Sequence, residues 1–238
     1  MQANGVRYQR FSVLHRILHF IVMLGFTVLA ATGLTLAFSG NFAARAFASV
    51  LGGAAALAGW HKWFAVITYS CVIVHGLWFI YYKSVLRGKL TGPHSIAPSR
   101  RDVGEFVHHL RFVLGRSKTP PRFERFTYLE KIDYWAVFVG MNTMGLTGLL
   151  LWFPEFFSSF LPGFFINIAR ILHFFEALLA IVIKFIIHGG MAHFRPSVYP
   201  GDSTIFSGKT TEAKMKAEHP LEWERLKGSE APAAGEKP

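Results

Sequence analysis

The sequence predicts an all-α fold: an integral membrane four-helix bundle with one further helix at the cytoplasmic surface. Hydrophobic residues make up 52% of the 238-residue chain, which contains 24 phenylalanines, and this composition suits contact with lipid. Four apolar segments approach the roughly 20 residues that a helix needs to cross a bilayer. A shorter amphipathic segment lies between the second and the third of them.

The four apolar segments occupy residues 17–38, 63–82, 134–153 and 164–187. An even number of crossings places both termini on the same side of the membrane. Basic residues mark the cytoplasmic side of bacterial membrane proteins, and here they precede the first segment and fill the second connection: Arg7, Arg10, Arg16, Lys83, Arg87, Lys89, Arg100, Arg101, Arg111, Arg116, Lys118, Arg122 and Arg125. We therefore expect a multi-pass protein of the bacterial cytoplasmic (inner) membrane with both termini in the cytoplasm.

The amphipathic segment covers about residues 103–114, where apolar residues recur at helical spacing: Val103, Phe106, Val107, Leu110, Val113 and Leu114. This pattern is typical of a helix that lies in the plane of the lipid headgroups. We expect two parts in the chain, a transmembrane domain over 1–195 and a polar cytoplasmic tail over 196–238, with the last ten residues disordered.

The same composition excludes several classes of function. The net charge of +11 is carried by residues between or outside the apolar segments, so we expect no nucleic-acid partner. The single cysteine, Cys71, allows neither a disulfide framework nor a cysteine-bound metal cluster. Any bound metal must therefore be held by histidine. The first apolar segment is long enough to span, so we expect no removable signal peptide.

Two short strings occur twice in the chain. The string Arg-Ile-Leu-His-Phe is found at 16–20 and 170–174, and Thr-Gly-Leu at 32–34 and 147–149. Their phases do not match a simple duplication of helix pairs. We interpret them as repeated solutions to one local problem, the fitting of a large flat ligand between helices.

Four histidines occur at depths that match in pairs. A b-type haem held by two imidazoles needs one histidine from each of two facing helices. The direction of each helix places His19 near the cytoplasmic face and His61 near the periplasmic face, while the fourth helix carries His173 and His188 at its two ends. We therefore predict two b-type haems, held by His61 with His173 and by His19 with His188.

The two histidines of the fourth helix do not share one face of a regular α-helix. The 15 residues from His173 to His188 span about 22 Å, with an angular offset of about 60° in a regular α-helix. A local bulge in the helix could reduce this offset.

Other polar residues near these histidines are candidate haem contacts. Arg16 and Arg170 stand one turn before His19 and His173, where a guanidinium could pair with a haem propionate. Lys184 could pair with a propionate, contact a quinone, or extend to the cytoplasmic surface. His75 could replace His19 as the partner of His188, and otherwise would act beside that haem or in a proton path. No catalytic residue is assigned.

The chain resembles a known family through a set of short motifs: Arg16-x-x-His19, Thr32-Gly33-Leu34, His61, Glu130-Lys131 before Trp135, 147–154 (Thr-Gly-Leu-Leu-Leu-Trp-Phe-Pro), Leu172-His173 and Ile187-His188. These motifs resemble the cytochrome b (gamma) subunit of membrane-bound respiratory formate dehydrogenases, within the wider family of bacterial cytochrome b561 and nickel–iron hydrogenase cytochrome b. The resemblance covers about residues 7–195.

The resemblance implies the same two ligand pairs and a menaquinone or ubiquinone site on the cytoplasmic side, near the start of the third spanning helix. The corresponding quinone contacts here would be Thr127, Glu130, Lys131 and Tyr134. The interval from His173 to His188 is one residue longer than the resemblance implies.

Three functions are compatible with these features. The first is a subunit of a respiratory oxidoreductase complex, carrying electrons across the membrane between quinone and a periplasmic iron–sulfur or multihaem cytochrome c subunit. The second is a stand-alone cytochrome b561-like oxidoreductase that acts on quinol, superoxide or ferric iron. The third is a transporter or structural membrane protein in which the histidines are packing residues.

Overall fold

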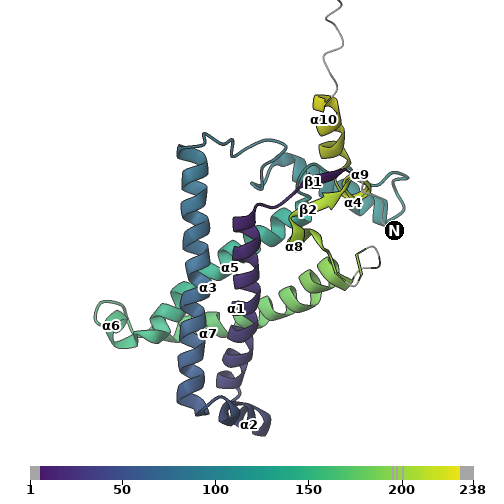
Figure 1. Cartoon of the computed structure of the whole chain (residues 1–238). Helices are drawn as coiled ribbons and strands as arrows, with labels where there is room; N and C mark the ends of the chain where they lie inside the picture. Colours follow the sequence, from purple (N-terminus) through teal and green to yellow (C-terminus); the bar gives the residue numbers. More distant parts are fainter. Residues whose placement is uncertain (1–5, 195, 197, 200, 231–238) are drawn as a thin grey trace, which may run out of the picture. The chain divides into compact units, whose positions relative to one another are not determined.

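The computed structural model describes residues 6–194, 196, 198–199 and 201–230 (Figure 1). Four helical stretches are long and apolar enough to cross a membrane: α1 (Val13–Ala37), α3 (Gly53–Ser84), α5 (Tyr128–Trp152) and Phe164–His188. The last of these joins α7 (Phe164–Ile181) to the π-helix η1 (Val182–His188). The prediction of an all-α membrane helical bundle is confirmed.

The spanning helices expose apolar side chains along most of their length. Phe20 on α1, Leu77 on α3 and Phe175 on α7 are all exposed. In water such a surface would be unfavourable, whereas in a bilayer it is in contact with hydrocarbon. The long apolar exposure therefore agrees with a protein that is embedded in lipid.

The connections between the spanning helices contain short helices of their own. After α1, Asn41 caps α2 (Phe42–Val50) by accepting a hydrogen bond from the backbone nitrogen of Ala43 at 2.8 Å. Two glycines with positive φ, Gly52 and Gly53, then turn the chain into α3, which begins ten residues before the predicted apolar segment. The 53–62 stretch is helical because it is rich in alanine, although it is less apolar than the rest. Pro154 opens α6 (Pro154–Ser158), which leads to α7.

The fourth spanning helix changes from α to π geometry between its two histidines. α7 continues without a break into η1, which ends at His188, and a second π-helix, η2, follows at Gly190–Phe194. A π-turn contains more residues than an α-turn. It therefore rotates His188 backward relative to its position in a regular α-helix. The bulge that the spacing suggested is present.

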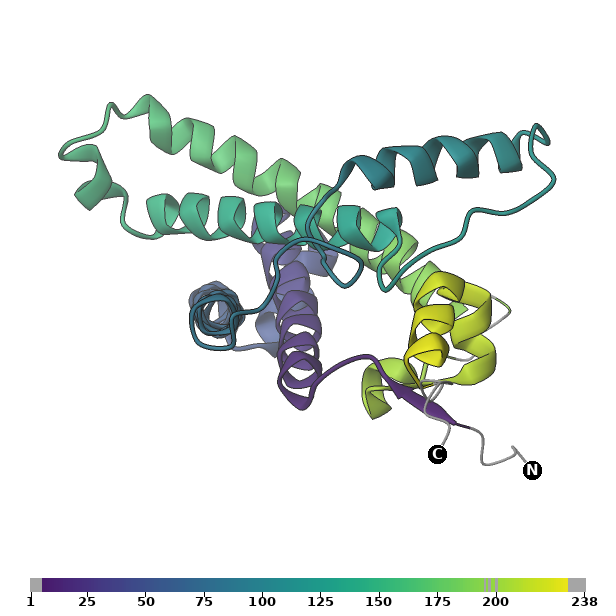
Figure 2. The same ribbon diagram turned by 90° about the horizontal axis from the view of Figure 1, so that it is seen from above.

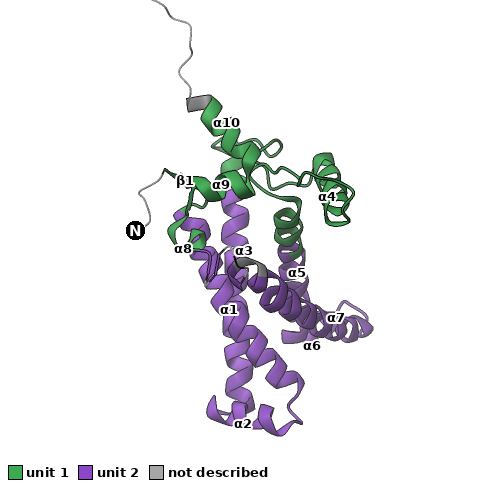
Figure 3. Cartoon of the chain, turned by 90° about the vertical axis from the view of Figure 1, so that its right-hand side faces the viewer, with its two compact units in different colours: residues 1–12, 80–136, 203–238 green, residues 13–79, 137–202 purple. Residues whose placement is uncertain are grey.

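Two compact units can be distinguished in the chain (Figure 3). Unit 1 comprises 1–12, 80–136 and 203–238, and unit 2 comprises 13–79 and 137–202. In unit 2, α1 lies beside α3 and α5 lies beside α7, and the second pair crosses the first obliquely (Figures 1 and 2). The predicted division at residue 195 stays a prediction, and these units divide the chain at other positions.

Unit 1 contains a folded C-terminal segment that the sequence did not reveal. β1 (Arg7–Gln9) pairs antiparallel with β2 (Lys209–Thr211), with Tyr8 opposite Thr210. The segment further contains α8 (Thr204–Ser207), α9 (Glu212–Glu218) and α10 (Pro220–Glu230). We expected disorder for the last ten residues, but Ser229 and Glu230 belong to α10. The other eight, 231–238, lie outside the described residues.

The predicted amphipathic helix is α4 (Arg100–Val113) in unit 1. It begins where the Asp102 carboxylate accepts a hydrogen bond from the backbone nitrogen of Ser99 at 2.5 Å. Val103, Leu110 and Val113 are exposed along it. An exposed apolar face suits a helix at the lipid surface, and its position in the headgroup plane stays a prediction.

A buried ion-pair cluster joins three distant segments of unit 1. The Glu222 carboxylate, whose side chain is 2% exposed, pairs with Arg10 and accepts a hydrogen bond from Arg125 Nη1 at 2.9 Å. Each arginine also donates to the backbone carbonyl of the other, at 2.6 Å and 2.5 Å. Removal of one partner from such a buried pair costs about 3–5 kcal/mol, because the remaining charge is left unpaired.

His219 completes this cluster in its neutral form. Its Nδ1 donates to the backbone carbonyl of Glu124 at 2.7 Å, so the lone pair on Nε2 accepts from Arg10 Nη2 at 3.0 Å. Burial lowers the pKa of His219, and the nearby Arg10 guanidinium lowers it further. A second proton would place two cations against each other.

We expect acidification to loosen this cluster. Because the pKa of His219 is lower in the folded state than its ordinary value of 6.5, the unfolded chain binds the proton more readily. The stabilisation is therefore present above pH 6.5 and is lost as the pH falls below that value. The protection factors of the β1–β2 amides against hydrogen exchange, taken relative to the intrinsic rate at each pH, should fall over this range in the wild type. In His219→Gln, which cannot titrate, the protection factors should change less, and an equal change in both proteins would contradict the assignment.

Candidate functional site

Unit 2 brings the four predicted histidines together in two pairs. The ring centres of His61 on α3 and His173 on α7 are 6.3 Å apart, and those of His19 on α1 and His188 on η1 are also 6.3 Å apart. Each pair joins one helix of the α1–α3 hairpin to the α7–η1 helix. These are the two pairs that depth along the helices predicted.

The separation within each pair suits a metal ion between the rings. An imidazole nitrogen binds a transition metal at about 2 Å and lies about 1.1 Å from its own ring centre, so two rings on opposite sides of one metal have centres roughly 6 Å apart. Among the described residues, no group of three or more His, Cys, Asp or Glu side chains could hold a metal ion. Two imidazoles alone fit a metal that brings its remaining ligands with it, as porphyrin iron does.

Each histidine of the first pair contacts a threonine on the neighbouring helix. Thr32 Oγ1 on α1 lies 2.9 Å from His61 Nδ1, and Thr147 Oγ1 on α5 lies 3.0 Å from His173 Nδ1. Both threonines belong to the repeated Thr-Gly-Leu string. We did not assign them to the site from the sequence, although their repetition was the signal that could have identified them.

The glycine that follows each threonine gives the histidine ring room. A Cβ atom at Gly33 would lie 3.1 Å from His61 Cε1, and one at Gly148 would lie 3.4 Å from His173 Cε1. The rings therefore approach the helix backbone at the two Thr-Gly steps. The repeated string serves to receive a histidine from the adjacent helix, a more specific reason for its recurrence than the flat ligand we expected.

His75 has ring contacts with His15 and Trp78. Its ring centre is 5.5 Å from that of His15 and 5.9 Å from that of Trp78, and the ring centres of His15 and Trp78 are 4.5 Å apart. The ring of His188, in contrast, lies 6.3 Å from that of His19. The geometry therefore favours His19 over His75 as the partner of His188.

The basic candidates lie next to the histidines along their own helices. Arg16 on α1 is half-buried one turn before His19, and Arg170 on α7 is exposed one turn before His173. Lys184 lies within η1, half-buried and four residues before His188. Contacts of these side chains with haem propionates stay predictions.

The predicted quinone contacts Thr127 and Glu130 have a local structural role. The Glu130 carboxylate accepts a hydrogen bond from the backbone nitrogen of Thr127 at 2.7 Å, and Thr127 Oγ1 accepts one from the backbone nitrogen of Glu130 at 3.1 Å. This reciprocal arrangement caps the start of α5. Tyr134 is half-buried on α5, with its ring centre 5.8 Å from that of Trp135.

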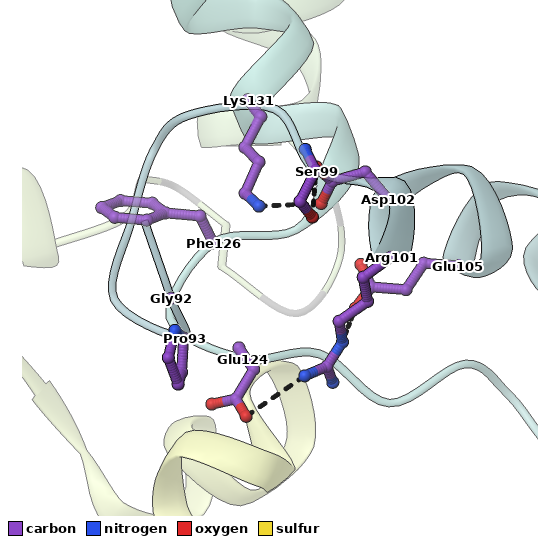
Figure 4. A pocket seen from close by; sticks show the side chains of 9 residues that line it. All are labelled: Gly92, Pro93, Ser99, Arg101, Asp102, Glu105, Glu124, Phe126 and Lys131. Atoms are coloured by element: carbon purple, nitrogen blue, oxygen red, sulfur yellow. Dashed lines mark hydrogen bonds and ion pairs between the residues drawn. The ribbon is translucent and has the colours of Figure 1, made fainter. Parts of the chain in front are cut away.

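Lys131, the fourth predicted quinone contact, lines a cavity of about 250 Å³ in unit 1 (Figure 4). Its ammonium group donates to Asp102 at 2.8 Å. On the other side of the cavity, Arg101 donates to Glu105 at 2.9 Å and lies 3.4 Å from Glu124. The basic groups of the cavity are thus engaged in ion pairs with carboxylates.

The chain matches a known protein family over most of its length. A sequence model described as prokaryotic cytochrome b561 matches residues 10–202, a stretch that contains both histidine pairs and all four spanning helices. The chain belongs to this family. No curated protein matches the chain.

Membership of the prokaryotic cytochrome b561 family implies a membrane cytochrome b that carries b-type haem and functions in electron transfer. The wider family that the sequence motifs resembled is thereby confirmed. The narrower resemblance, to the gamma subunit of formate dehydrogenase, stays a prediction.

We expect Gly33→Ala to reduce haem binding at the His61–His173 pair. The added methyl group would press on the His61 ring at 3.1 Å, and overpacking of this kind costs about 1–3 kcal/mol. The haem-to-protein ratio of the purified protein measures the effect. Gly148→Ala, at 3.4 Å, should have a smaller effect.

Gly76→Ala is the matched control, because a Cβ at this position on α3 meets no described atom within 4 Å. Alanine also favours helix over glycine by about 1 kcal/mol, so this variant should retain its full haem content. Equal haem contents in all three variants would contradict the steric role of Gly33.

Proposed function

We propose that this protein is the dihaem cytochrome b subunit of a respiratory oxidoreductase complex, transferring electrons across the membrane between a periplasmic redox partner and quinone. The observation that carries the proposal is the pair of equal 6.3 Å separations between histidine rings, each contributed by two different spanning helices. Both pairs share one continuous helix, α7–η1.

Haem would supply one-electron chemistry at each of the two histidine pairs, which define two levels in the membrane. The protein would hold it with His61 and His173 at one level and with His19 and His188 at the other. The two levels are separated along α7–η1 by 15 residues, or about 22 Å at α-helical rise. Arg16 and Arg170 would neutralise propionates, because a guanidinium pairs well with a carboxylate in a site of low polarity.

The direction of the helices supports the proposed topology. If the basic second connection is cytoplasmic, α3 begins at the periplasmic side, and His61 lies near that side. A periplasmic iron–sulfur or multihaem cytochrome c subunit would then exchange electrons at the His61–His173 level, and menaquinone or ubiquinone at the His19–His188 level. A formate dehydrogenase gamma-like subunit of the inner membrane is the narrowest form of this proposal.

The main support for a role of quinone is the position of the His19–His188 pair near the proposed cytoplasmic side. The four quinone contacts inferred from the resemblance add less support, because three of them have other partners in the structure. Thr127 and Glu130 cap α5, and Lys131 pairs with Asp102. Their substitution would therefore disturb unit 1 directly. A quinone assay on these variants needs a parallel measurement of the fold.

We expect alanine substitutions of the histidines to remove haem pairwise. His61→Ala and His173→Ala should each lose the same haem, and His19→Ala and His188→Ala should each lose the other, so that the haem-to-protein ratio falls from two to about one in every case. Reduced-minus-oxidised spectra and redox titration identify the component that is lost.

His75→Ala is the control for this series, since it removes a neighbouring imidazole and should retain both haems. Retention of two haems in His19→Ala would instead transfer the ligand role to His75. Absence of any b-type spectrum in the wild type would contradict the proposal as a whole. Purification of the wild type without an accompanying subunit would favour the stand-alone oxidoreductase.

A further inference from the structure

We propose that Thr32 and Thr147 are positioning residues that select Nε2 as the metal-binding nitrogen of His61 and His173. This inference rests on the proposed function, because it concerns the orientation of the proposed haem ligands. Thr32 on α1 and Thr147 on α5 do not bind the metal themselves. They lie on the helices beside α3 and α7, which carry His61 and His173.

The single hydroxyl proton of Thr32 is directed at a backbone carbonyl oxygen. Thr32 Oγ1 lies 2.7 Å from the backbone carbonyl oxygen of Val28 and 2.9 Å from His61 Nδ1. A carbonyl oxygen can only accept a hydrogen bond, so the short contact with Val28 requires the hydroxyl to donate there. The contact with His61 must then be one in which Thr32 accepts and Nδ1–H donates.

Thr147 repeats this arrangement on the other pair of helices. Its Oγ1 donates to the backbone carbonyl of Thr143 at 2.6 Å and lies 3.0 Å from His173 Nδ1. The same reasoning places a proton on Nδ1 of His173. Two independent sites thus share one hydrogen-bond pattern, which a chance packing contact would not explain.

The proton on Nδ1 determines which ring nitrogen can bind a metal. When Nδ1 carries the proton, the lone pair is on Nε2. The hydrogen bond made by one ring nitrogen determines which nitrogen is available to a metal, and it also fixes the orientation of the ring. Thr32 and Thr147 therefore hold the two rings with Nδ1 directed at their own hairpin and Nε2 free to face a metal between them.

The experiment compares Thr32→Val and Thr147→Val with Thr32→Ser and Thr147→Ser in the full-length protein with haem bound. Valine keeps the branched shape of threonine but has no acceptor, whereas serine keeps the hydroxyl. Thr35→Val is the matched control, because the half-buried Thr35 makes the same bond on α1, from its Oγ1 to the carbonyl of Ala31 four residues before it, at 2.7 Å.

Each valine variant should bind the haem held by His61 and His173 about 10- to 100-fold more weakly. In the fraction of protein that still binds this haem, its midpoint potential should shift upward. The reason is that an imidazole that loses its hydrogen-bond acceptor donates less electron density to ferric iron. Both variants should alter the same single component of the redox titration. The serine variants and Thr35→Val should keep wild-type affinity and potentials.

Pulsed EPR of the oxidised protein supplies a readout that a merely structural role would not move. The quadrupole coupling of the remote ring nitrogen reports the hydrogen bond at Nδ1, and it should change in the valine variants and not in the serine variants. Unchanged coupling and potential in both valine variants, with two haems bound, would overturn this inference while leaving the proposed function intact. A wild-type protein without haem would overturn the proposed function instead.

Discussion

The requirement that polar atoms inside a bilayer be satisfied by the protein itself governs this structure. An imidazole has two nitrogens, and in a lipid environment each of them needs a partner that water does not supply. At the His61–His173 level, one nitrogen of each ring meets a threonine hydroxyl on the adjacent helix. The glycine next to each threonine permits the approach. Each occurrence of the Thr-Gly-Leu string thus defines where its own hairpin, α1–α3 or α5–α7, accepts a histidine.

A second constraint acts along the helix that both levels share. A regular α-helix would direct two side chains 15 residues apart to faces that differ by about 60°. The π-helix from Val182 to His188 changes this phase at no cost in helix continuity, since its backbone groups remain hydrogen-bonded. The ring of His188 consequently lies opposite that of His19. The 15-residue interval between His173 and His188 is thus matched by a local change of helix type.

Sequence reasoning was sufficient where the determinants are periodic or close in the chain. Hydropathy identified the four spans, and helix direction paired the histidines, because depth in a membrane is nearly linear in residue number. It did not assign Thr32 and Thr147, whose role depends on which helix lies beside which. It also gave Thr127 and Glu130 a ligand role by resemblance, although a threonine followed three residues later by glutamate is itself a capping signal. The folded C-terminal segment was missed because its contacts join residues far apart in the chain, such as Arg125 and Glu222, which are 97 positions apart, and Arg10 and Glu222, which are 212 positions apart.

The burial of Arg10 against Glu222 has a consequence for biosynthesis. The two residues are 212 positions apart, so the carboxylate that neutralises Arg10 is synthesised long after Arg10 itself. During translation the spanning helices enter the membrane while the amino-terminal strand still lacks its partner strand. Unit 1 can therefore close around this ion pair only after the segment that carries β2 and Glu222 has been synthesised.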